Sequence, residues 1–377
     1  MYYTFAGKIK FPSHLYKIKK TESDSSSFDI CLRKLVIKNN PDVSDFINKT
    51  VDTQTFNPYN VSIFITNNLT DIDNLQDNKS EFIVNLRNVN NTKRINPFLR
   101  AINKKLIMGG VYAGSFENLR ERSRRLRKKY KYIPNIIVLT GDFFIFRVFT
   151  KLPILRKLYP LITRERNRVI SFTEMLGRLS YCGFEMLNMT EINNTLHFVV
   201  KKTNLPSQNP EPNYGMVFKM SRIGKNGKRI YVYKLRTMHI YSEYLQKFVY
   251  ENFSLKEGGK FNDDFRVTEY GRILRKLWID ELPMFVNFFK GELKFIGVRP
   301  LSEHYLSLYD QETRDKRLKV KPGLFPPFYA DMPKTIDEIQ QSENKYIDSY
   351  LAHPIKTDLI YFYKIVKNIV FKKARSN

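Results

Sequence analysis

Residues 278–287 read Trp-Ile-Asp-Glu-Leu-Pro-Met-Phe-Val-Asn, and this stretch decides how the C-terminal part of the chain folds. Apolar residues recur from 282 onward at the spacing of a helix, which predicts a helix that Gly291 ends. Two adjacent carboxylates, Asp280 and Glu281, then lie in its first turn. The unpaired N–H groups of such a turn favour an ionised Asp280 and a phosphate beside it. Acids in a first turn also occur simply as capping residues, so their neighbours in the sequence carry the interpretation.

Further motifs rich in basic residues and glycine surround the two acids. They are Lys234-Leu235-Arg236-Thr237-Met238, Asp264-Phe265-Arg266-Val267-Thr268, Gly271-Arg272-Ile273-Leu274-Arg275, Gly297-Val298-Arg299-Pro300-Leu301 and Lys321-Pro322-Gly323. In this order and spacing they resemble the bacterial sugar transferase family. These are the monotopic phosphoglycosyl transferases, which move a sugar phosphate from a nucleotide sugar to a polyprenyl phosphate. The resemblance runs from about Tyr214 to the C-terminus.

The resemblance implies roles for both acids. Asp280 matches the covalent nucleophile, and Glu281 matches its partner at a magnesium ion, so both are expected to hold Mg²⁺ together with substrate phosphates. The implied reaction transfers a sugar 1-phosphate from a nucleotide sugar, with UDP as the expected nucleotide, through an aspartyl phosphosugar intermediate. It would initiate the synthesis of a surface glycan.

Transfer between anions also requires fixed cations, and arginine can hold two phosphate oxygens at once. Each of these cations also has an ordinary interpretation as a solvated surface charge. The basic residues expected to bind substrate are Lys234, Arg236, Arg275, Arg299 and Lys321.

Two features depart from the family pattern. The family's Arg-Pro-Gly-Ile-Thr-Gly appears here as Lys-Pro-Gly-Leu-Phe-Pro-Pro at 321–327, so the sugar is not predicted. The family's hydrophobic re-entrant helix is replaced by a polar, proline-rich linker at 204–213. Asn226-Gly227 predicts a structural hairpin turn and not a phosphate loop, because the glycine spacing and the terminal Lys-Ser/Thr of that motif are missing.

Residues 120–163 form a basic and apolar insertion. Eight of the twelve residues at 120–131 are Lys or Arg, and an apolar run interrupted by charges follows. The run is too broken for a spanning helix, and it suits attachment at an anionic membrane surface, lying in the interface or dipping in and out. The alternative is a basic surface helix followed by a buried helix. The expected location is the cytoplasmic face of the bacterial inner membrane, with peripheral or monotopic attachment.

The composition favours partners that carry phosphate. The chain has 64 Lys and Arg against 37 Asp and Glu, a formal charge of +27. Such a charge attracts nucleic acid, lipid headgroups or nucleotide sugars without choosing among them. The alternative to an enzyme is therefore a non-catalytic protein on a lapsed transferase scaffold that binds nucleic acid or lipid headgroups. A mere polyanion binder gains nothing from Asp280 and Glu281 beside its cations, so nucleic acid is not the expected partner.

Residues 1–203 predict a separate α/β domain. A strand at 81–86, a helix at 95–105, a strand at 106–113, a helix at 171–182 and strands at 184–189 and 196–201 alternate along it. This series resembles the C-terminal half of a Rossmann-like methyltransferase, through Ile107-Met108-Gly109-Gly110 and Gly183-Phe184-Glu185. Before Gly109 the sequence has only Gly7, so no glycine-rich turn can approach a cofactor closely. The prediction is a degenerate Rossmann-like domain (1–203), a linker (204–213) and a small α+β catalytic domain (214–377).

Overall fold

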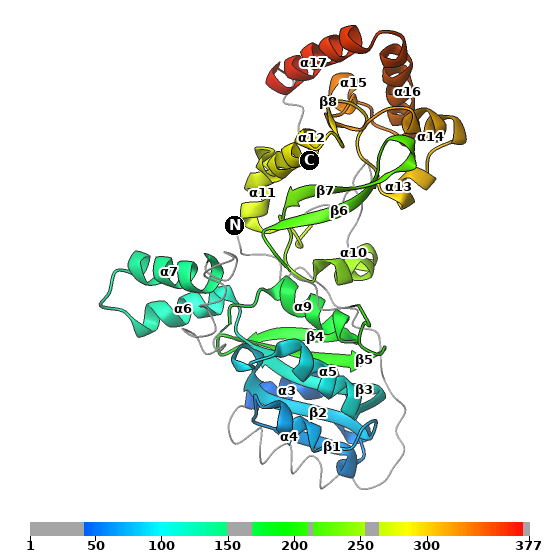
Figure 1. Cartoon of the computed structure of the whole chain (residues 1–377). Helices are drawn as coiled ribbons and strands as arrows, with labels where there is room; N and C mark the ends of the chain where they lie inside the picture. The colour runs from blue at the N-terminus through cyan, green and yellow to red at the C-terminus, as the bar shows by residue number, and fades with distance from the viewer. Residues whose placement is uncertain (1–40, 149–167, 210–213, 253–263, 372–377) are drawn as a thin grey trace. The chain divides into compact units, whose positions relative to one another are not determined.

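A computed structural model gives the fold, and it describes residues 41–148, 168–209, 214–252 and 264–371 (Figure 1). The chain divides into two compact units. The N-terminal unit comprises residues up to Pro212 together with Ile240–Asn252, and the C-terminal unit comprises Asn213–His239 and Phe253–Asn377. Residues 1–40 of the predicted N-terminal domain and residues 149–163 of the predicted insertion fall outside the described residues.

The N-terminal unit is built on a five-stranded sheet with the order β1-β2-β3-β5-β4. The strands β1, β2 and β3 are parallel, whereas β5 is antiparallel to both of its neighbours, β3 and β4. The strands are β1 (Val61–Phe64), β2 (Ser80–Asn88), β3 (Leu106–Phe116), β4 (Phe184–Ile192) and β5 (Thr195–Lys202).

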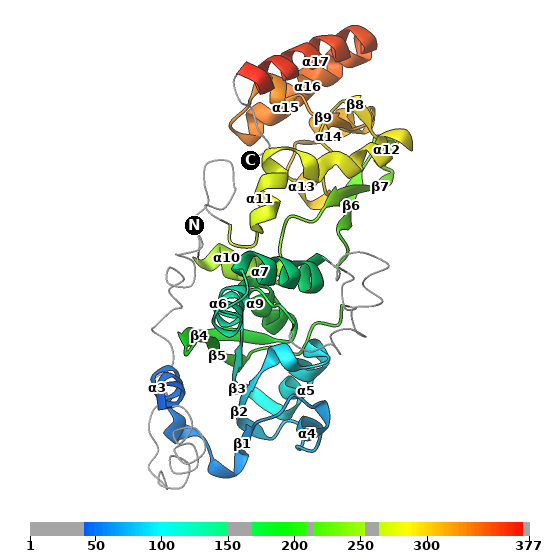
Figure 2. The same ribbon diagram turned by 90° about the vertical axis from the view of Figure 1, so that its left-hand side faces the viewer.

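Helices cover both faces of this sheet, as Figure 2 shows with α3 on one side and α4 and α5 on the other. Residues of β2 alternate between the two faces, so Phe82 and Val84 pack with Phe46 and Ile47 of α3. The unit's helices and short turns are α3 (Pro41–Thr50), η2 (Thr53–Thr55), η3 (Pro58–Asn60), α4 (Leu69–Asp73), η4 (Val89–Asn91), α5 (Ile95–Lys105), α6 (Leu119–Lys129), α7 (Asn135–Phe143), η5 (Phe144–Val148), α9 (Phe172–Tyr181), η7 (Ser242–Leu245) and α10 (Gln246–Asn252).

The predicted α/β series of this unit is confirmed. The helix predicted at 95–105 is α5, and Ser171 caps α9 by accepting a hydrogen bond from the Glu174 amide. Gly183 has φ +85°, where a left-handed residue ends the helix. The described parallel strands follow one another in a single direction. Ligands of doubly wound sheets bind at the position where the strand order reverses. The described parallel strands β1, β2 and β3 have no reversal of order, which agrees with the prediction of a degenerate Rossmann-like domain.

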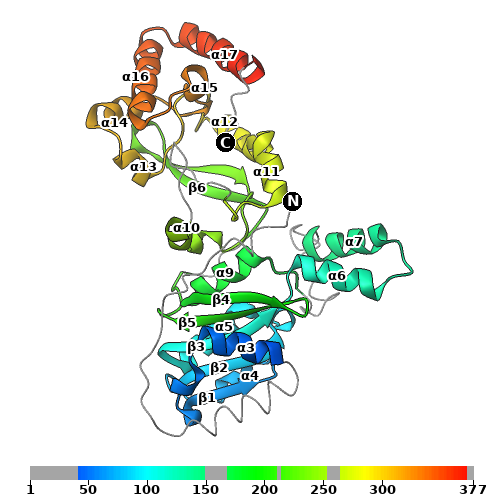
Figure 3. The same ribbon diagram turned by 180° about the vertical axis from the view of Figure 1, so that it is seen from behind.

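The two helices of the predicted insertion project side by side from this unit (Figure 3). None of the residues of α7 is buried, so the predicted alternative of a buried second helix is wrong for the described part of the insertion. Among the described residues, no helix has the length and apolar character needed to cross a bilayer.

The predicted boundary between the units needs one change. The division at Pro212 lies within the predicted linker, but Ile240–Asn252 packs with the N-terminal unit although it follows the first strands of the C-terminal unit. Tyr241 explains this, because its ring contacts that of Tyr181 at 5.3 Å between centroids and its hydroxyl accepts a hydrogen bond from Asn96. Gly177 allows the close approach, since a Cβ there would lie 2.3 Å from the Tyr241 carbonyl oxygen.

The C-terminal unit combines an antiparallel hairpin, a short parallel strand pair and helices. Its elements are β6 (Val217–Ile223), η6 (Lys225–Gly227), β7 (Arg229–Leu235), α11 (Glu269–Lys276), η8 (Ile279–Met284), α12 (Phe285–Phe289), β8 (Lys294–Ile296), α13 (Glu303–Ser307), α14 (Gln311–Leu318), β9 (Gly323–Phe325), α15 (Phe328–Asp331), α16 (Ile336–Ala352) and α17 (Pro354–Phe371). The hairpin predicted at Asn226-Gly227 is confirmed. The helix α17 buries Tyr361 and Ile365 in the core of this unit.

The helix predicted from residues 278–287 differs in type and orientation. Its first part is the 3₁₀ segment η8, and a regular α-helix begins only at Phe285. The apolar stripe that predicted the helix is exposed, whereas Met284 and Asn287 face the core. The five-residue α12 is too short to supply a strong dipole, and this turn favours the ionised Asp280 through a hydrogen bond from the residue's own backbone amide, which lowers the pKa of the carboxyl.

Candidate active site

The turn at Trp278 sets the direction in which the two acids project. Trp278 ends the helix α11 in a left-handed conformation, with φ 57°, and its ring packs on Tyr329 at 5.5 Å. A left-handed non-glycine residue is uncommon, so the packing of the indole holds the chain in this conformation. Asp280 and Glu281 follow directly in η8, beside the strand β7.

Glu281 forms an ion pair with Lys234 of β7. The Lys234 Nζ donates to Glu281 Oε1 at 2.5 Å, and both side chains are largely shielded from solvent. A charge-assisted hydrogen bond of this length fixes both groups in one geometry. The strand and the acidic turn, which lie 47 residues apart in sequence, are thereby joined at the site.

Asp280 lies deeper than its neighbour, with 8% of its surface exposed. Burial raises the pKa of this carboxyl, and the adjacent Glu281 raises it further, while the charges of Lys234 and Arg275 lower it. No side chain of the described residues hydrogen-bonds the Asp280 carboxylate. A hydrogen bond from its own backbone amide also lowers the pKa, and its oxygens remain accessible to a reacting group.

Arg275 belongs to the last turn of α11 and is positioned by Thr237. Its Nε donates to the Thr237 hydroxyl at 3.0 Å. Burial lowers the pKa of this guanidinium, and the negative charges of Asp280 and Asp264 act against that shift. An arginine so placed stays protonated and supplies a fixed positive charge near Asp280.

Asn287 is fully buried and connects β7 to the acidic turn. Its Nδ2 donates to the Tyr231 carbonyl at 2.7 Å and to Glu292 at 2.6 Å, and its Oδ1 accepts from the Tyr233 amide at 3.1 Å. One side chain thus satisfies two backbone groups of the strand that carries Lys234. The sequence places Asn287 within the diagnostic stretch without indicating this role.

Arg299 reaches the site from the loop after β8. That loop crosses the start of β9 so closely that a Cβ on Gly323 would lie 2.2 Å from the Gly297 nitrogen. Arg317, which is buried and paired with Glu343, donates to the Arg299 carbonyl and anchors the loop from its other side. Glycine at both crossing positions and a buried cation behind the loop together set the position of Arg299.

A pocket in this unit brings several of these side chains together. Its lining includes Lys234, Glu281 and Arg299 together with apolar residues, and Arg222 of β6, which the sequence analysis assigned to a structural hairpin, lines it as well. Burial and the nearby Arg299 charge lower the pKa of Arg222. No carboxylate of the described residues pairs with Arg222 or Arg299, so two like charges share a pocket that an anion would neutralise. For Arg222 the sequence carried no signal beyond its place in the predicted hairpin.

Two predicted substrate contacts lie elsewhere. Arg236 stacks on the rings of Tyr214 and Phe218, and its Nε donates to the Gly215 carbonyl. Lys321 is exposed, and its Nζ approaches Gly291. Neither residue lines the pocket.

Asp280 and Glu281 carry carboxylate oxygens, which are the donor atoms that magnesium prefers. Within the described residues, no cluster of three or more His, Cys, Asp or Glu side chains forms a complete metal cage. Magnesium in phosphate chemistry is held by one or two carboxylates and by substrate oxygens, which Asp280 and Glu281 fit. Glu281 keeps one oxygen that Lys234 does not engage.

The comparison with known families identifies this unit. Residues 204–372 match the bacterial sugar transferase family. This part of the chain is therefore similar to that family. The match includes both acids and every cation of the pocket, and the sugar transferase domain starts, in this comparison, within the predicted linker.

Curated relatives align with the sugar transferase domain. A galactosyl transferase of Streptococcus agalactiae is 33% identical over 138 residues, which cover 36% of this chain and 30% of that protein. A sugar transferase of Bacillus subtilis is 40% identical over 107 residues, covering 28% and 46%. The UDP-N-acetylgalactosamine-undecaprenyl-phosphate N-acetylgalactosaminephosphotransferase of Aeromonas hydrophila is 35% identical over 113 residues, covering 29% and 24%. The chain thus spans less than half the length of these relatives.

Solved structures align with part of the chain at low similarity. An S-adenosylmethionine-dependent methyltransferase from Mesorhizobium loti is 12% identical, with a TM-score of 0.22, and the match covers 35% of this chain and 67% of that one. A methyltransferase from Thermotoga maritima is 14% identical, with a TM-score of 0.21, covering 35% and 61%. The description of the N-terminal unit as a partial α/β sheet therefore rests on its own strand order.

Proposed function

We propose that the protein is a phosphoglycosyl transferase that moves a sugar 1-phosphate from a UDP-sugar to a polyprenyl phosphate. The observation that carries this proposal is the buried Asp280, next to Glu281 and within the field of Lys234 and Arg275. The match to the bacterial sugar transferase family supports it, as do relatives whose names specify undecaprenyl phosphate as acceptor. The reaction would initiate a surface glycan at the cytoplasmic face of a bacterial membrane.

The first displacement uses the Asp280 carboxylate as nucleophile. One of its oxygens attacks the phosphorus that bears the sugar, the bond from that phosphorus to the bridging oxygen breaks, and the nucleoside monophosphate leaves with the electron pair. An aspartyl phosphosugar results. In the second displacement an oxygen of the polyprenyl phosphate attacks the same phosphorus, a diphosphate bond forms, and the Asp280 carboxylate is released.

Burial gives Asp280 its reactivity. A poorly solvated carboxylate has little bound water to shed before it reaches the phosphorus. The raised pKa of Asp280 reflects the same poor solvation. The charges of Lys234 and Arg275 oppose that rise in pKa and favour the ionised form. Arg222 and Arg299 in the pocket provide positive charge for the phosphate oxygens of the donor, which would otherwise repel the nucleophile.

Asp280 and Glu281 would hold Mg²⁺, which when bound neutralises diphosphate oxygens. The ion pair with Lys234 orients Glu281 before any ion arrives. In this proposal Asp280 is both the nucleophile and a metal ligand, as the sequence predicted, and Glu281 is a metal ligand.

Release of nucleoside monophosphate tests this function directly. The full chain is incubated with UDP-sugars, magnesium and a polyprenyl phosphate. We expect turnover, loss of turnover in Asp280→Asn, and retention in Asp315→Asn, which changes an exposed aspartate of α14. A labelled donor without acceptor should leave a phosphosugar on Asp280, detectable by mass spectrometry of the intact chain.

The same variants separate the enzyme from a non-catalytic polyanion binder. A binder would show no release of nucleoside monophosphate, and Asp280→Asn would tighten its hold on a nucleotide sugar, because one repelling charge has gone. Full activity in Asp280→Asn would rule out the proposed nucleophile.

A further inference from the structure

The α6–α7 hairpin is the part of the N-terminal unit that extends away from the sheet (Figures 1 and 3). Asn118 caps α6 by accepting hydrogen bonds from the Arg120 and Glu121 amides, and residues 130–134 connect the two helices. Leu126 is the apolar residue of α6 that is buried, and α7 buries none. The hairpin thus contributes little to the core, and most of its side chains face solvent.

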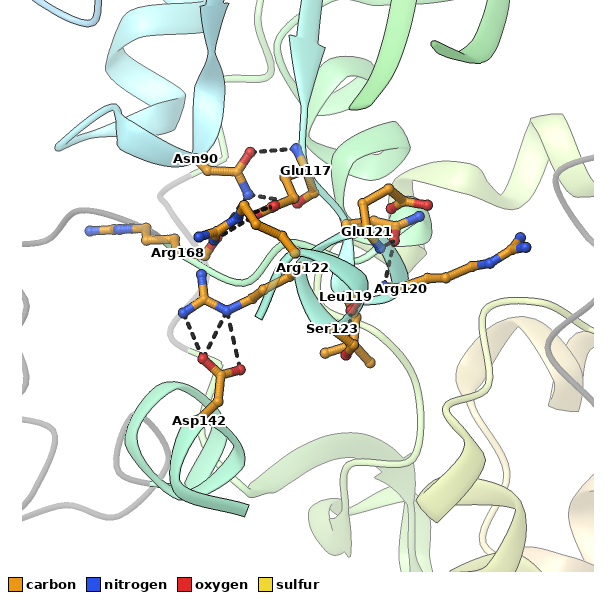
Figure 4. Close-up of polar contacts among 11 residues, drawn as sticks. Asn90, Glu117, Leu119, Arg120, Glu121, Arg122, Ser123, Asp142 and Arg168 are labelled. Carbon is orange, nitrogen blue, oxygen red and sulfur yellow. Dashed lines mark hydrogen bonds and ion pairs between the residues drawn. The ribbon is translucent and has the colours of Figure 1, made fainter. Parts of the chain in front are cut away.

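The acidic side chains of the hairpin are withdrawn from its surface. Asp142 of α7 pairs with Arg122 of α6 through hydrogen bonds of 2.7 and 2.9 Å, with side chains only 12% and 5% exposed (Figure 4). Glu121 is buried, and its burial raises the pKa of the carboxyl. The described surface of the hairpin therefore presents no uncompensated negative charge.

Cations gather where α6 ends. Arg124 is neutralised by Glu191 of β4, and Arg125 by Glu117, which follows β3. The following basic residues have no carboxylate within ion-pair distance among the described residues, and all of them are exposed. They are Arg127, Lys128, Lys129 and Lys131.

Large apolar side chains follow these cations without a break. Ile136 is 76% exposed and Ile137 is 62% exposed on α7, which packs beside α6. Exposed groups of this size, adjoining one another, are a signal of an interaction surface. The exposed apolar residues of the hairpin are Tyr132, Ile133, Ile136, Ile137, Phe143 and Phe144.

We propose that the α6–α7 hairpin docks on the surface of an anionic lipid bilayer. Four exposed cations complement the headgroups, and the adjoining isoleucines and aromatic rings enter the boundary between headgroups and acyl chains. Tyr132 beside Lys131, with the ammonium 4.7 Å from the ring centre, is an arrangement suited to that boundary. The nine residues of α7 and the five of η5 that continue it together span about 20 Å, shorter than a hydrocarbon core of about 30 Å, so the described part of the hairpin lies in the interface.

A bilayer accounts for both halves of the surface. Nucleic acid would engage the cations but leave the isoleucines of α7 in water, and an apolar protein groove would accept the isoleucines while burying four unpaired cations. The surface lies outside the sugar transferase domain, so the proposal does not depend on the proposed catalytic function.

A polarity-sensitive fluorophore tests this docking at a single position. It is attached to Ile137→Cys in a full-length Cys31→Ser background, since Cys182 is buried. Vesicles of phosphatidylglycerol and phosphatidylcholine, without donor or polyprenyl phosphate, should shift the emission to the blue. The same label at Tyr59→Cys, which replaces a 94% exposed side chain, is the control and should not respond.

Each other outcome of this measurement overturns the proposal. Blue-shifted emission before vesicles are added would show that another part of the chain covers α7. A response to single-stranded RNA but not to vesicles would assign the hairpin to nucleic acid. Equal responses at positions 137 and 59 would show that the hairpin has no preference for the bilayer.

Flotation with the same vesicles measures the contribution of charge. The triple variant Lys128→Gln, Lys129→Gln and Lys131→Gln should partition about a hundredfold more weakly, because each basic residue near an anionic leaflet contributes roughly a factor of five. Added salt should weaken wild-type binding in the same direction. The matched control removes three exposed cations of the same unit, as Lys79→Gln, Arg87→Gln and Lys93→Gln. Equal losses in the two triple variants would reduce the effect to net charge and refute a docking role for the hairpin.

Discussion

Asn287→Ala should lower the free energy of unfolding of the C-terminal unit by about 3 kcal/mol. The wild-type amide satisfies the Tyr231 carbonyl and the Tyr233 amide, and the residue is fully buried. Alanine leaves both backbone groups without a partner, at roughly 1–3 kcal/mol each. The Glu292 carboxylate, which also accepts from this side chain, can turn to water and adds little.

The single tryptophan of the chain makes this loss measurable in the intact protein. Trp278 lies in the C-terminal unit, packed on Tyr329, so its fluorescence in urea follows that unit and not the N-terminal sheet. A loss of about 3 kcal/mol lowers the urea midpoint by about 1–2 M for a slope of about 2 kcal/mol per M. Turnover should fall as well, because β7 positions Lys234 against Glu281.

The control for this prediction is Gln341→Ala. This amide is exposed on α16, and its loss should change the free energy of unfolding by less than about 0.5 kcal/mol. If Asn287→Ala proves no more destabilising than Gln341→Ala, the inference that one side chain ties β7 to the acidic turn is refuted.

Further predictions concern the loop, the ionisation of the nucleophile and the newly recognised arginine. Gly323→Ala should abolish turnover and lower the urea midpoint, because its Cβ would lie 2.2 Å from the Gly297 nitrogen; a fully active variant would contradict the crossing geometry. Lys234→Met removes a charge that lowers the pKa of Asp280, so the acidic limb of kcat/KM against pH should move to higher pH, and an unmoved limb would contradict this electrostatic role. Asp280→Asn should stabilise the C-terminal unit at neutral pH. An acid whose folded pKa is raised opposes folding once pH exceeds its ordinary value, and equal urea midpoints for wild type and variant would argue against that burial cost. Arg222→Gln should weaken UDP binding, followed by Trp278 fluorescence, about tenfold; unchanged affinity would remove this arginine from the site.

Local patterns predicted most elements of both units. The capping box at Ser171, the turn at Asn226-Gly227 and the strand that ends at Lys234 follow from residues a few positions apart, and the structure has each of them. The ordered motifs also located the two acids. Of the five basic residues predicted from those motifs, Lys234, Arg275 and Arg299 lie near Asp280 or line the pocket. The position of Arg222 in the pocket was not predicted, because a hairpin pattern indicates which residues pair across the strands but not which face of the hairpin lines a pocket.

The sequence by itself determined the series of helices and strands, the adjacent acids and the resemblance of the C-terminal part to the bacterial sugar transferase family, because each depends on neighbours along the chain. Only the tertiary structure decided that the apolar stripe after Asp280 faces outward, that Asn287 supports β7 and that Arg236 turns from the pocket. It also decided that Arg122 withdraws Asp142 from the surface of the hairpin. These outcomes depend on contacts between distant segments, and the burial that raises the pKa of Asp280 exists only once those segments have packed together.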